Sequence, residues 1–144
     1  MAMRTICIVL FLTIFLPAFG QNSVSYCYKG KMDGKMPITM FIKSQDNGCT
    51  ADLVYQGMYK YDGVSNWLQL EISQNKSGQF IFVEYHFSGV MILKKTPDGF
   101  SGLWISPDTK KQLKVELHKE NLNEKDRMNL EDKFEKVNYE NNDC

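Results

Sequence analysis

Apolar and polar residues alternate along most of the chain, and short polar turn sequences interrupt the alternation at regular intervals. A period of two is typical of a β-strand that buries one of its faces. Turn sequences such as Asp33-Gly34 and Ser77-Gly78 provide the left-handed backbone that a tight reversal requires. The pattern predicts eight strands, at residues 25–32, 35–43, 50–60, 65–73, 79–87, 89–95, 99–105 and 110–118.

The apolar positions within a predicted strand share one parity, so the strands can enclose a common core. These positions are Met36, Ile38, Met40 and Ile42; Leu53, Tyr55, Gly57 and Tyr59; Leu68, Leu70 and Ile72; and Leu113, Val115 and Leu117. Short connections favour sequential antiparallel neighbours. Eight such strands can close on themselves and enclose either packed side chains or one small ligand. We therefore predict an all-β fold, an eight-stranded antiparallel meander closed as a small lipocalin-like barrel.

The end of the chain has a different pattern. Residues 120–144 are rich in charge, and Leu130, Phe134 and Val137 fall at positions i, i+4 and i+7. That spacing predicts a C-terminal helix of about four turns with a narrow apolar stripe. Two interpretations remain open: the helix docks on the barrel, or it is a detachable arm that engages a partner.

Large aromatic side chains also fall on the parity that faces away from the predicted core. Phe41 and Trp67 have this parity in their strands, and Phe80 and Phe82 have it if Ile81 points inward. Exposed apolar patches mark either a surface that another part of the chain covers or a recognition site. The four aromatic residues are therefore candidate partner-binding residues, with the C-terminal helix as the alternative occupant of the patch.

The first twenty residues predict export. An apolar run at residues 6–16 lies between Arg4 and the small-residue pattern Ala18-Phe19-Gly20. This is the pattern of a signal peptide cleaved before Gln21. The remainder contains no apolar stretch long enough for a membrane span, so we expect a secreted or periplasmic protein. The expected divisions are a signal peptide at 1–20, a barrel domain at 21–119 and a helix with a polar tail at 120–144.

Cleavage also changes the charge balance. The whole chain has 17 basic and 17 acidic side chains, and removal of Arg4 takes the basic count from 17 to 16, which leaves a net charge of −1. A chain without a basic excess has no general attraction for nucleic acid. We therefore expect no nucleic-acid partner.

Cysteines tend to pair in an oxidising compartment. Cleavage removes one of the four cysteines and leaves Cys27, Cys49 and Cys144. We predict a disulfide between Cys27 and Cys49, because both lie toward the same end of the meander and the bond would close a loop of about 20 residues. A two-residue turn at Asp33-Gly34 would place Cys27 opposite Met40, so the later loop must fold back for the sulfurs to meet. Cys144 could reach either partner instead.

The chain has few candidate catalytic groups. His86 and His118 are the only histidines, and neither has the spacing of a metal site. Glu84 and His86 share a face of one predicted strand, so the carboxylate could orient the imidazole. A polar strand end that faces solvent is the more ordinary explanation of this pair. We predict that the protein is not an enzyme and uses no metal or cofactor.

Several strings within residues 26–117 resemble a small all-β domain that is common in exported proteins of Bacteroidota: YKGKMDGKMPITMFI, YQGMYKY, LQLEI, FSGVMIL and GFSGLW. That domain has a Tyr-x-Gly start, a Pro-Ile-x-Met segment and a late Gly-x-Trp element. The resemblance implies fold and export but no activity. The string YCYKG is also similar to the Tyr-x-Cys-x-x-Gly opening of periplasmic β-barrel inhibitors of lysozyme. The Ser-Gly-x-x-Tyr loop of that family is not matched, because the nearest string, residues 87–91, has no tyrosine.

These features favour an exported non-enzymatic binding protein, an inhibitor or immunity-type protein that acts on another protein, such as an envelope enzyme or toxin. The alternative is a lipocalin-like carrier of a small apolar ligand, with Met36 and Met40 in the interior. A hydrolase is the third hypothesis and would need a polar pocket around His86 or His118. An unfilled barrel would favour the carrier, whereas a filled barrel with an exposed patch would favour the protein binder.

Overall fold

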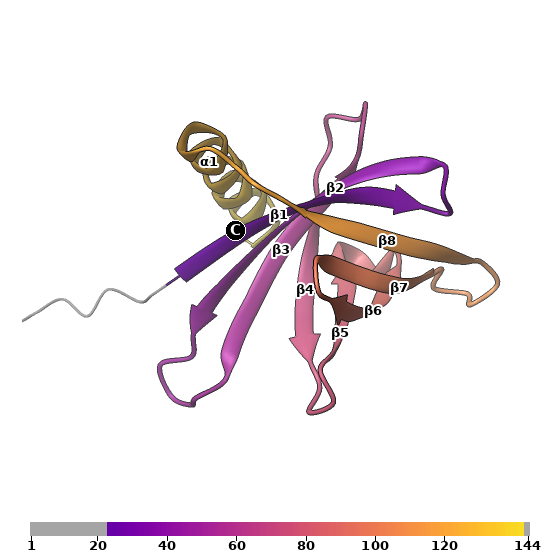
Figure 1. The fold of residues 1–144 in the computed structure, drawn as a ribbon, viewed down its shortest axis with the longest axis horizontal. Coiled ribbons are helices and arrows are strands. Elements are labelled where there is room, and N and C mark those ends of the chain that lie inside the picture. Colours follow the sequence, from indigo (N-terminus) through magenta and orange to yellow (C-terminus); the bar gives the residue numbers. More distant parts are fainter. Residues whose placement is uncertain (1–22, 143–144) are drawn as a thin grey trace, which may run out of the picture.

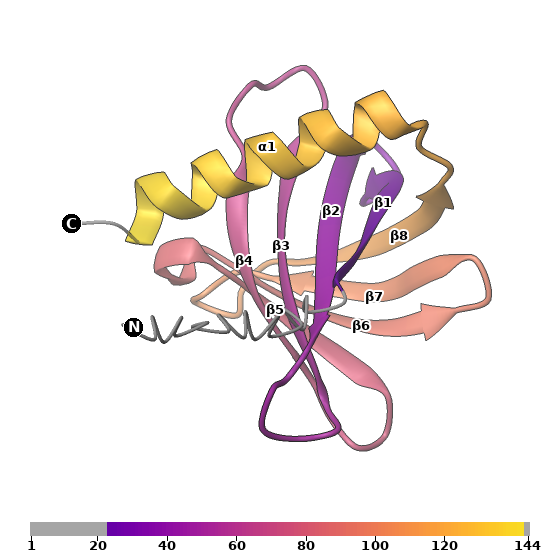
Figure 2. The same cartoon turned by 90° about the vertical axis from the view of Figure 1, so that its left-hand side faces the viewer.

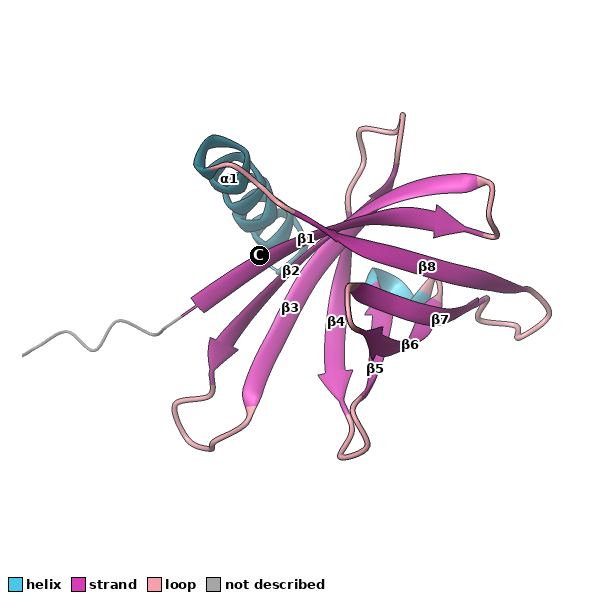
Figure 3. Cartoon of the chain, viewed as in Figure 1, coloured by secondary structure: helices cyan, strands magenta, loops and turns pink. Residues whose placement is uncertain are grey.

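The computed structural model describes residues 23–142 and shows a closed barrel of eight antiparallel strands with one C-terminal helix (Figures 1 and 3). The predicted fold class is confirmed. The predicted signal peptide at 1–20 and Cys144 lie outside the described residues. The elements are β1 (Ser23–Met32), β2 (Met36–Asp46), β3 (Leu53–Tyr61), β4 (Leu68–Gln74), β5 (Gln79–Glu84), the 3₁₀ turn η1 (Tyr85–Phe87), β6 (Val90–Thr96), β7 (Gly99–Ile105), β8 (Gln112–Glu120) and α1 (Glu124–Asn142).

The barrel closes through β1, which pairs with β2 on one side and with β8 on the other. The seam joins residues 27–32 of β1 to residues 115–120 of β8. Gly30 lies in this seam, and a Cβ atom there would lie 1.8 Å from the carbonyl oxygen of Glu116. A residue without a side chain is therefore needed where the first and last strands approach each other.

The connection between β1 and β2 is one residue longer than predicted. Residues 33–35 form it, and the first two of them have left-handed φ angles of 54° and 66°. The longer turn shifts the register by one residue, so Cys27 lies opposite Phe41 rather than Met40. Residues directly opposite each other share a face of the sheet, and this pair faces away from the barrel interior.

Side chains fill the interior of the barrel. Phe100 contacts three other rings there, with ring-centroid distances of 5.1 Å to Tyr28, 5.3 Å to Phe80 and 5.8 Å to Phe82. Edge-to-face contacts of this kind add to the gain from burial. The predicted core parity is confirmed for β2, β4 and β8, whereas Leu53 of β3 is exposed. The interior cluster comprises Tyr28, Met32, Ile38, Met40, Ile42, Tyr59, Leu70, Ile72, Phe80, Phe82, Met91, Leu93, Phe100, Leu113, Val115 and Leu117.

Helix α1 lies on the outer surface of the barrel, across the strands at the start of the chain (Figure 2). Phe134 and Val137 of the helix pack against Phe41 and Met58 in a second buried cluster. The rings of Phe41 and Phe134 have centroids 6.0 Å apart. The helix is therefore docked on the barrel, as the first of the two interpretations expected.

Polar contacts at both ends fix the position of α1. At its start, the side-chain oxygen of Asn123 accepts a hydrogen bond of 2.9 Å from the backbone N–H of Asp126, which caps the helix. Near its end, the amide nitrogen of Gln69 donates a hydrogen bond of 2.9 Å to Asn138. Within residues 23–142, no helix combines the length and the apolar character needed to cross a bilayer.

Candidate functional site

The four aromatic residues predicted to form a partner surface do not lie together. Phe41 is fully buried beneath α1, and Trp67 is half-buried against the same cluster. The outward orientation predicted for Phe80 and Phe82 is wrong, because both lie inside the barrel. Every residue from 80 to 83 is apolar, so alternation alone could not decide which parity faces inward.

The carboxyl group of Glu84 explains the orientation of β5. Glu84 is buried inside the barrel and accepts hydrogen bonds from the hydroxyl of Tyr59, from the indole N–H of Trp104 at 2.7 Å and from the hydroxyl of Ser88 at 2.6 Å. A carboxylate can be buried when it receives donors of this kind. Burial and the hydrogen bond to Glu84 raise the pKa of Tyr59 far above its ordinary value, so the tyrosine remains a donor.

The connection between β5 and β6, residues 85–89, is held in a strained conformation. His86 and Phe87 have φ angles of 60° and 54°, a left-handed conformation that costs about 1–3 kcal/mol at a non-glycine residue. The connection is anchored by the Ser88–Glu84 bond and by a hydrogen bond of 2.5 Å from the Tyr85 hydroxyl to a carbonyl of α1. The anchors hold Phe87 in place with 56% of its surface exposed.

Gly89 completes the anchoring of this connection. A Cβ atom at this position would lie 2.4 Å from the Nε1 atom of Trp104, so the indole packs directly on the backbone of the glycine. The N–H of Glu84 donates a hydrogen bond of 3.0 Å to the carbonyl of Gly89. The connection is therefore tied to Glu84 twice, by a backbone hydrogen bond at Gly89 and by the bond from the Ser88 hydroxyl to the carboxylate.

A row of exposed aliphatic side chains crosses the outer surface of β5, β6 and β7. Ile81, Ile92 and Leu103 are direct neighbours in the ladder and keep 40%, 45% and 41% of their surface exposed. The next outward row, Val83, Val90 and Ile105, is half-buried, and residues 85–89 follow directly beyond it. We call these six residues and Phe87 the outer apolar face. Its six strand residues lie on β5, β6 and β7, away from α1 (Figure 2), whereas the connection that carries Phe87 contacts the end of the helix through Tyr85. The sequence does not single out this face, because β5 and β6 are apolar on both parities.

The histidines do not form a catalytic arrangement with the predicted partner. Glu84 points into the barrel, whereas His86 is exposed, so the carboxylate does not orient the imidazole. The more ordinary explanation, a polar strand end that faces solvent, is wrong for Glu84 because its side chain is buried. His118 instead contacts Asp98 at 2.8 Å, and both side chains are exposed. The hydrogen bond to His118 holds the pKa of the Asp98 carboxyl below its usual range. Among residues 23–142, no three His, Cys, Asp or Glu side chains cluster as metal ligands.

The predicted disulfide between Cys27 and Cys49 is not found, because both residues are free thiols in the structure. Cys27 is buried on the outer wall of β1, opposite Phe41, whereas Cys49 is exposed in the connection between β2 and β3. Cys27 lines a hollow together with Leu122 and Arg127, so it lies beside α1 and its linker rather than beside that connection. Burial raises the pKa of the Cys27 thiol to about 11, so it is not a reactive thiolate.

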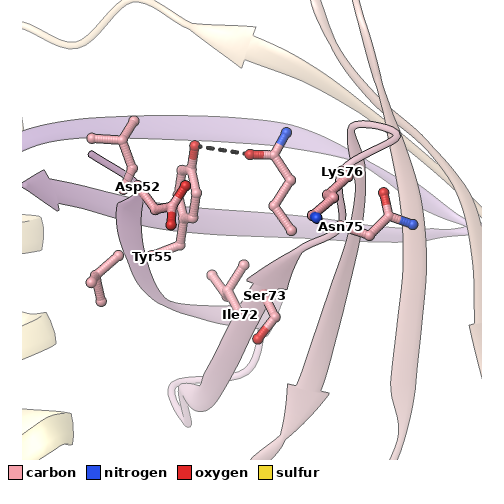
Figure 4. A pocket seen from close by; sticks show the side chains of 9 residues that line it. Asp52, Tyr55, Ile72, Ser73, Asn75 and Lys76 are labelled. Carbon is pink, nitrogen blue, oxygen red and sulfur yellow. Dashed lines mark hydrogen bonds between the residues drawn. The ribbon is translucent and has the colours of Figure 1, made fainter. Parts of the chain in front are cut away.

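A separate hollow of about 440 Å³ lies at the end of the barrel where β3 and β4 diverge (Figure 4). The hydroxyl of Tyr55 donates a hydrogen bond of 3.3 Å to the Oε1 atom of Gln74 across this hollow. The hollow opens on the barrel surface, and Tyr55 and Ile72 form its border with the packed interior. Its lining residues are Asp52, Leu53, Val54, Tyr55, Ile72, Ser73, Gln74, Asn75 and Lys76.

Comparison with known proteins assigns no family to the chain. No protein-family model matches it, and neither the curated proteins nor the solved structures contain a match. A barrel fold alone does not define an activity. The function must therefore be argued from the surfaces described above.

Proposed function

We propose that this chain is an exported, non-enzymatic protein that binds another protein, in the manner of an inhibitor or of an immunity protein of the cell envelope. The observation that carries the proposal is the outer apolar face, in which the exposed row Ile81, Ile92 and Leu103 is followed by a half-buried row and then by the connection that exposes Phe87. Exposed apolar surface that no other part of the chain covers is typical of recognition sites.

The rigidity of residues 85–89 favours recognition of a folded partner. A connection that is already held in its bound shape loses little conformational freedom on association. An aromatic side chain at the centre of an interface commonly contributes more than 2 kcal/mol when it enters a pocket on the partner. Phe87 is the exposed side chain with these properties, since its backbone is held by Glu84 and Tyr85.

The packing of the interior bears on the alternative hypothesis, a carrier of a small apolar ligand. Met36 and Met40 line a core that aromatic rings already occupy, and Phe100 contacts three of those rings. A ligand could enter that space only by displacing packed side chains, at a cost of several kcal/mol. The proposal therefore places binding on the outer surface rather than inside the barrel.

Differential affinity capture tests the proposal. The mature chain, residues 21–144, is immobilised in its wild-type form and as the variants Ile92→Asp and Val64→Asp, and retained proteins are quantified by mass spectrometry. Val64 is the matched control, because it is an aliphatic residue that is 49% exposed in the connection between β3 and β4. We expect at least one protein to be retained by the wild type and by Val64→Asp and lost from Ile92→Asp. Equal retention by all three forms would contradict the proposal.

A further inference from the structure

The strands β3 and β4 separate before either of them ends. Their pairing stops at Tyr55 opposite Ile72, yet both strands continue for two residues along their other neighbours. Residues 53–54 pair with β2, and residues 73–74 pair with β5. The two hairpins therefore diverge at this end of the barrel (Figure 1), and we call the opening between residues 52–55 and 72–76 the β3–β4 notch.

Each side of the notch presents backbone that the β3–β4 ladder leaves unpaired. In an antiparallel sheet, successive residues of a strand direct their N–H and C=O groups alternately to one side and to the other. One residue of the pair 53–54 and one of the pair 73–74 therefore direct both groups into the notch, beyond the last β3–β4 pair. Unpaired groups at a strand edge are a template for another extended segment, and here two edges face each other.

The shape and charge of the notch fit the same kind of occupant. Leu53, Val54 and Ile72 provide apolar wall, and Leu53 is 47% exposed without a covering residue. Asp52 and Lys76 lie on opposite sides of the opening, so it is electrically balanced and favours an occupant without net charge.

A second hollow makes the site longer than it is wide. It has a volume of about 350 Å³, shares Val54, Tyr55, Ile72 and Ser73 with the first, and continues to Asn138 and Asn142 of α1. Because β3 and β4 are paired from Tyr55 and Ile72 onward, this second hollow lies over the face of the ladder and not between its edges. Gln56 and Glu71 line this extension, and the amide of Gln56 can both donate to and accept from peptide groups, whereas Gln69 is already bonded to α1.

We propose that the β3–β4 notch binds an extended, uncharged polypeptide segment, which inserts as a short additional strand between β3 and β4. The segment displaces the hydrogen bond between Tyr55 and Gln74 that crosses the notch. Backbone hydrogen bonds to both edges provide the recognition, and one apolar side chain of the segment packs toward Tyr55 and Ile72. This site is separate from the outer apolar face, so the binding of a peptide in the notch can be tested independently of the proposed function.

The test uses the ¹⁵N-labelled mature chain, residues 21–144, and the capped peptide acetyl-Thr-Val-Thr-Val-Thr-amide. The peptide is added to about 5 mM while amide resonances are recorded, a range that detects dissociation constants near 1 mM. We expect saturable shifts of the amides of residues 53–54 and 73–74. Methylation of both valine nitrogens removes the donors that would face one edge and should weaken binding about tenfold or more.

Three protein variants complete the test. Leu53→Asp should weaken binding about tenfold, whereas Val64→Asp, which changes a residue of similar exposure outside the notch, should bind as the wild type does. Ile92→Asp, which disrupts the outer apolar face, should also bind normally. The proposal is wrong if residues 53–54 and 73–74 show no shifts, if the methylated peptide binds equally well, or if Leu53→Asp has no effect in a variant whose spectrum remains folded.

Discussion

Replacement of Glu84 tests whether the buried hydrogen bonds around it stabilise the barrel. In Glu84→Ala, the hydroxyl of Tyr59 and the indole of Trp104 lose an acceptor inside the barrel. Each buried donor without a partner costs about 1–3 kcal/mol, and the deleted side chain leaves a cavity in addition. We therefore expect the free energy of unfolding to fall by about 3–6 kcal/mol, a large part of the roughly 5–15 kcal/mol typical of a domain.

Glu84→Gln is the matched control for this prediction. Tyr59 and Trp104 both donate to the Oε1 atom of Glu84, and Ser88 donates to Oε2. A glutamine can keep the first two contacts through its carbonyl and can donate its amide N–H to the hydroxyl oxygen of Ser88. The loss should therefore stay below about 1.5 kcal/mol.

The assay is urea unfolding at neutral pH, followed by circular dichroism and by tryptophan fluorescence. Coincident transitions and an unchanged slope would show that the folded state is still lost in one step. The reasoning is refuted if Glu84→Ala lies within about 1 kcal/mol of the wild type, or if Glu84→Gln costs as much as Glu84→Ala.

Three further predictions concern the helix, the thiols and the seam. Phe134→Ala should cost about 3–5 kcal/mol in urea unfolding, because Phe134 is almost fully buried against Phe41, and an unchanged midpoint would show that α1 is not firmly docked. A chromogenic thiol reagent should label Cys49 in the folded protein and Cys27 only after unfolding. Burial raises the pKa of the Cys27 thiol from 9.0 to about 11, so the neutral thiol stabilises the folded state fully below pH 9 and this contribution is lost as the pH rises through 11. Cys27→Ala should reduce the loss of folding stability at alkaline pH by up to about 2 kcal/mol. An identical dependence of stability on pH in the variant and the wild type would contradict the assignment. Gly30→Ala should weaken the β1–β8 seam and lower the melting temperature, since its Cβ would overlap a carbonyl oxygen of β8. An unaltered melting curve would show that β1 and β8 can shift apart to accommodate the methyl group.

The fold was predictable because its main strands follow a period of two without ambiguity. Residues 36–42 and 113–117 place their apolar side chains on one parity, and both faces were assigned correctly. The stripe of Leu130, Phe134 and Val137 predicted the helix, and the same residues dock it. The local pattern of apolar and polar residues was therefore sufficient to predict these elements.

The orientation of β5 was not predictable from local pattern. Residues 80–83 are apolar on both parities, so the choice depends on Glu84, whose donors Tyr59 and Trp104 are 25 and 20 positions away in the chain. A buried carboxylate becomes favourable only when such distant partners converge on it. The outer apolar face follows from that orientation, so it could be identified only after the barrel was known.

Closure of the barrel has a consequence for how the chain acquires its structure. Met32 pairs with Val115, and these residues lie 83 positions apart in the sequence. A polypeptide that emerges N-terminus first, from a ribosome or a translocation channel, thus has one edge of β1 without a partner until nearly every strand has appeared. The entropic cost of closing that long loop arises in one late step, which makes the folding of such a topology slow.

During that interval the chain differs greatly from its finished form. An open sheet of seven strands would present two free edges and would leave Phe41 and Met58 uncovered, since α1 follows all eight strands in the chain. Exposed edges and apolar surface are the features that holdase chaperones bind and that lead to aggregation. The nascent chain should therefore depend on a chaperone, or on rapid emergence of β8 and α1, to a degree that the closed barrel itself does not reveal.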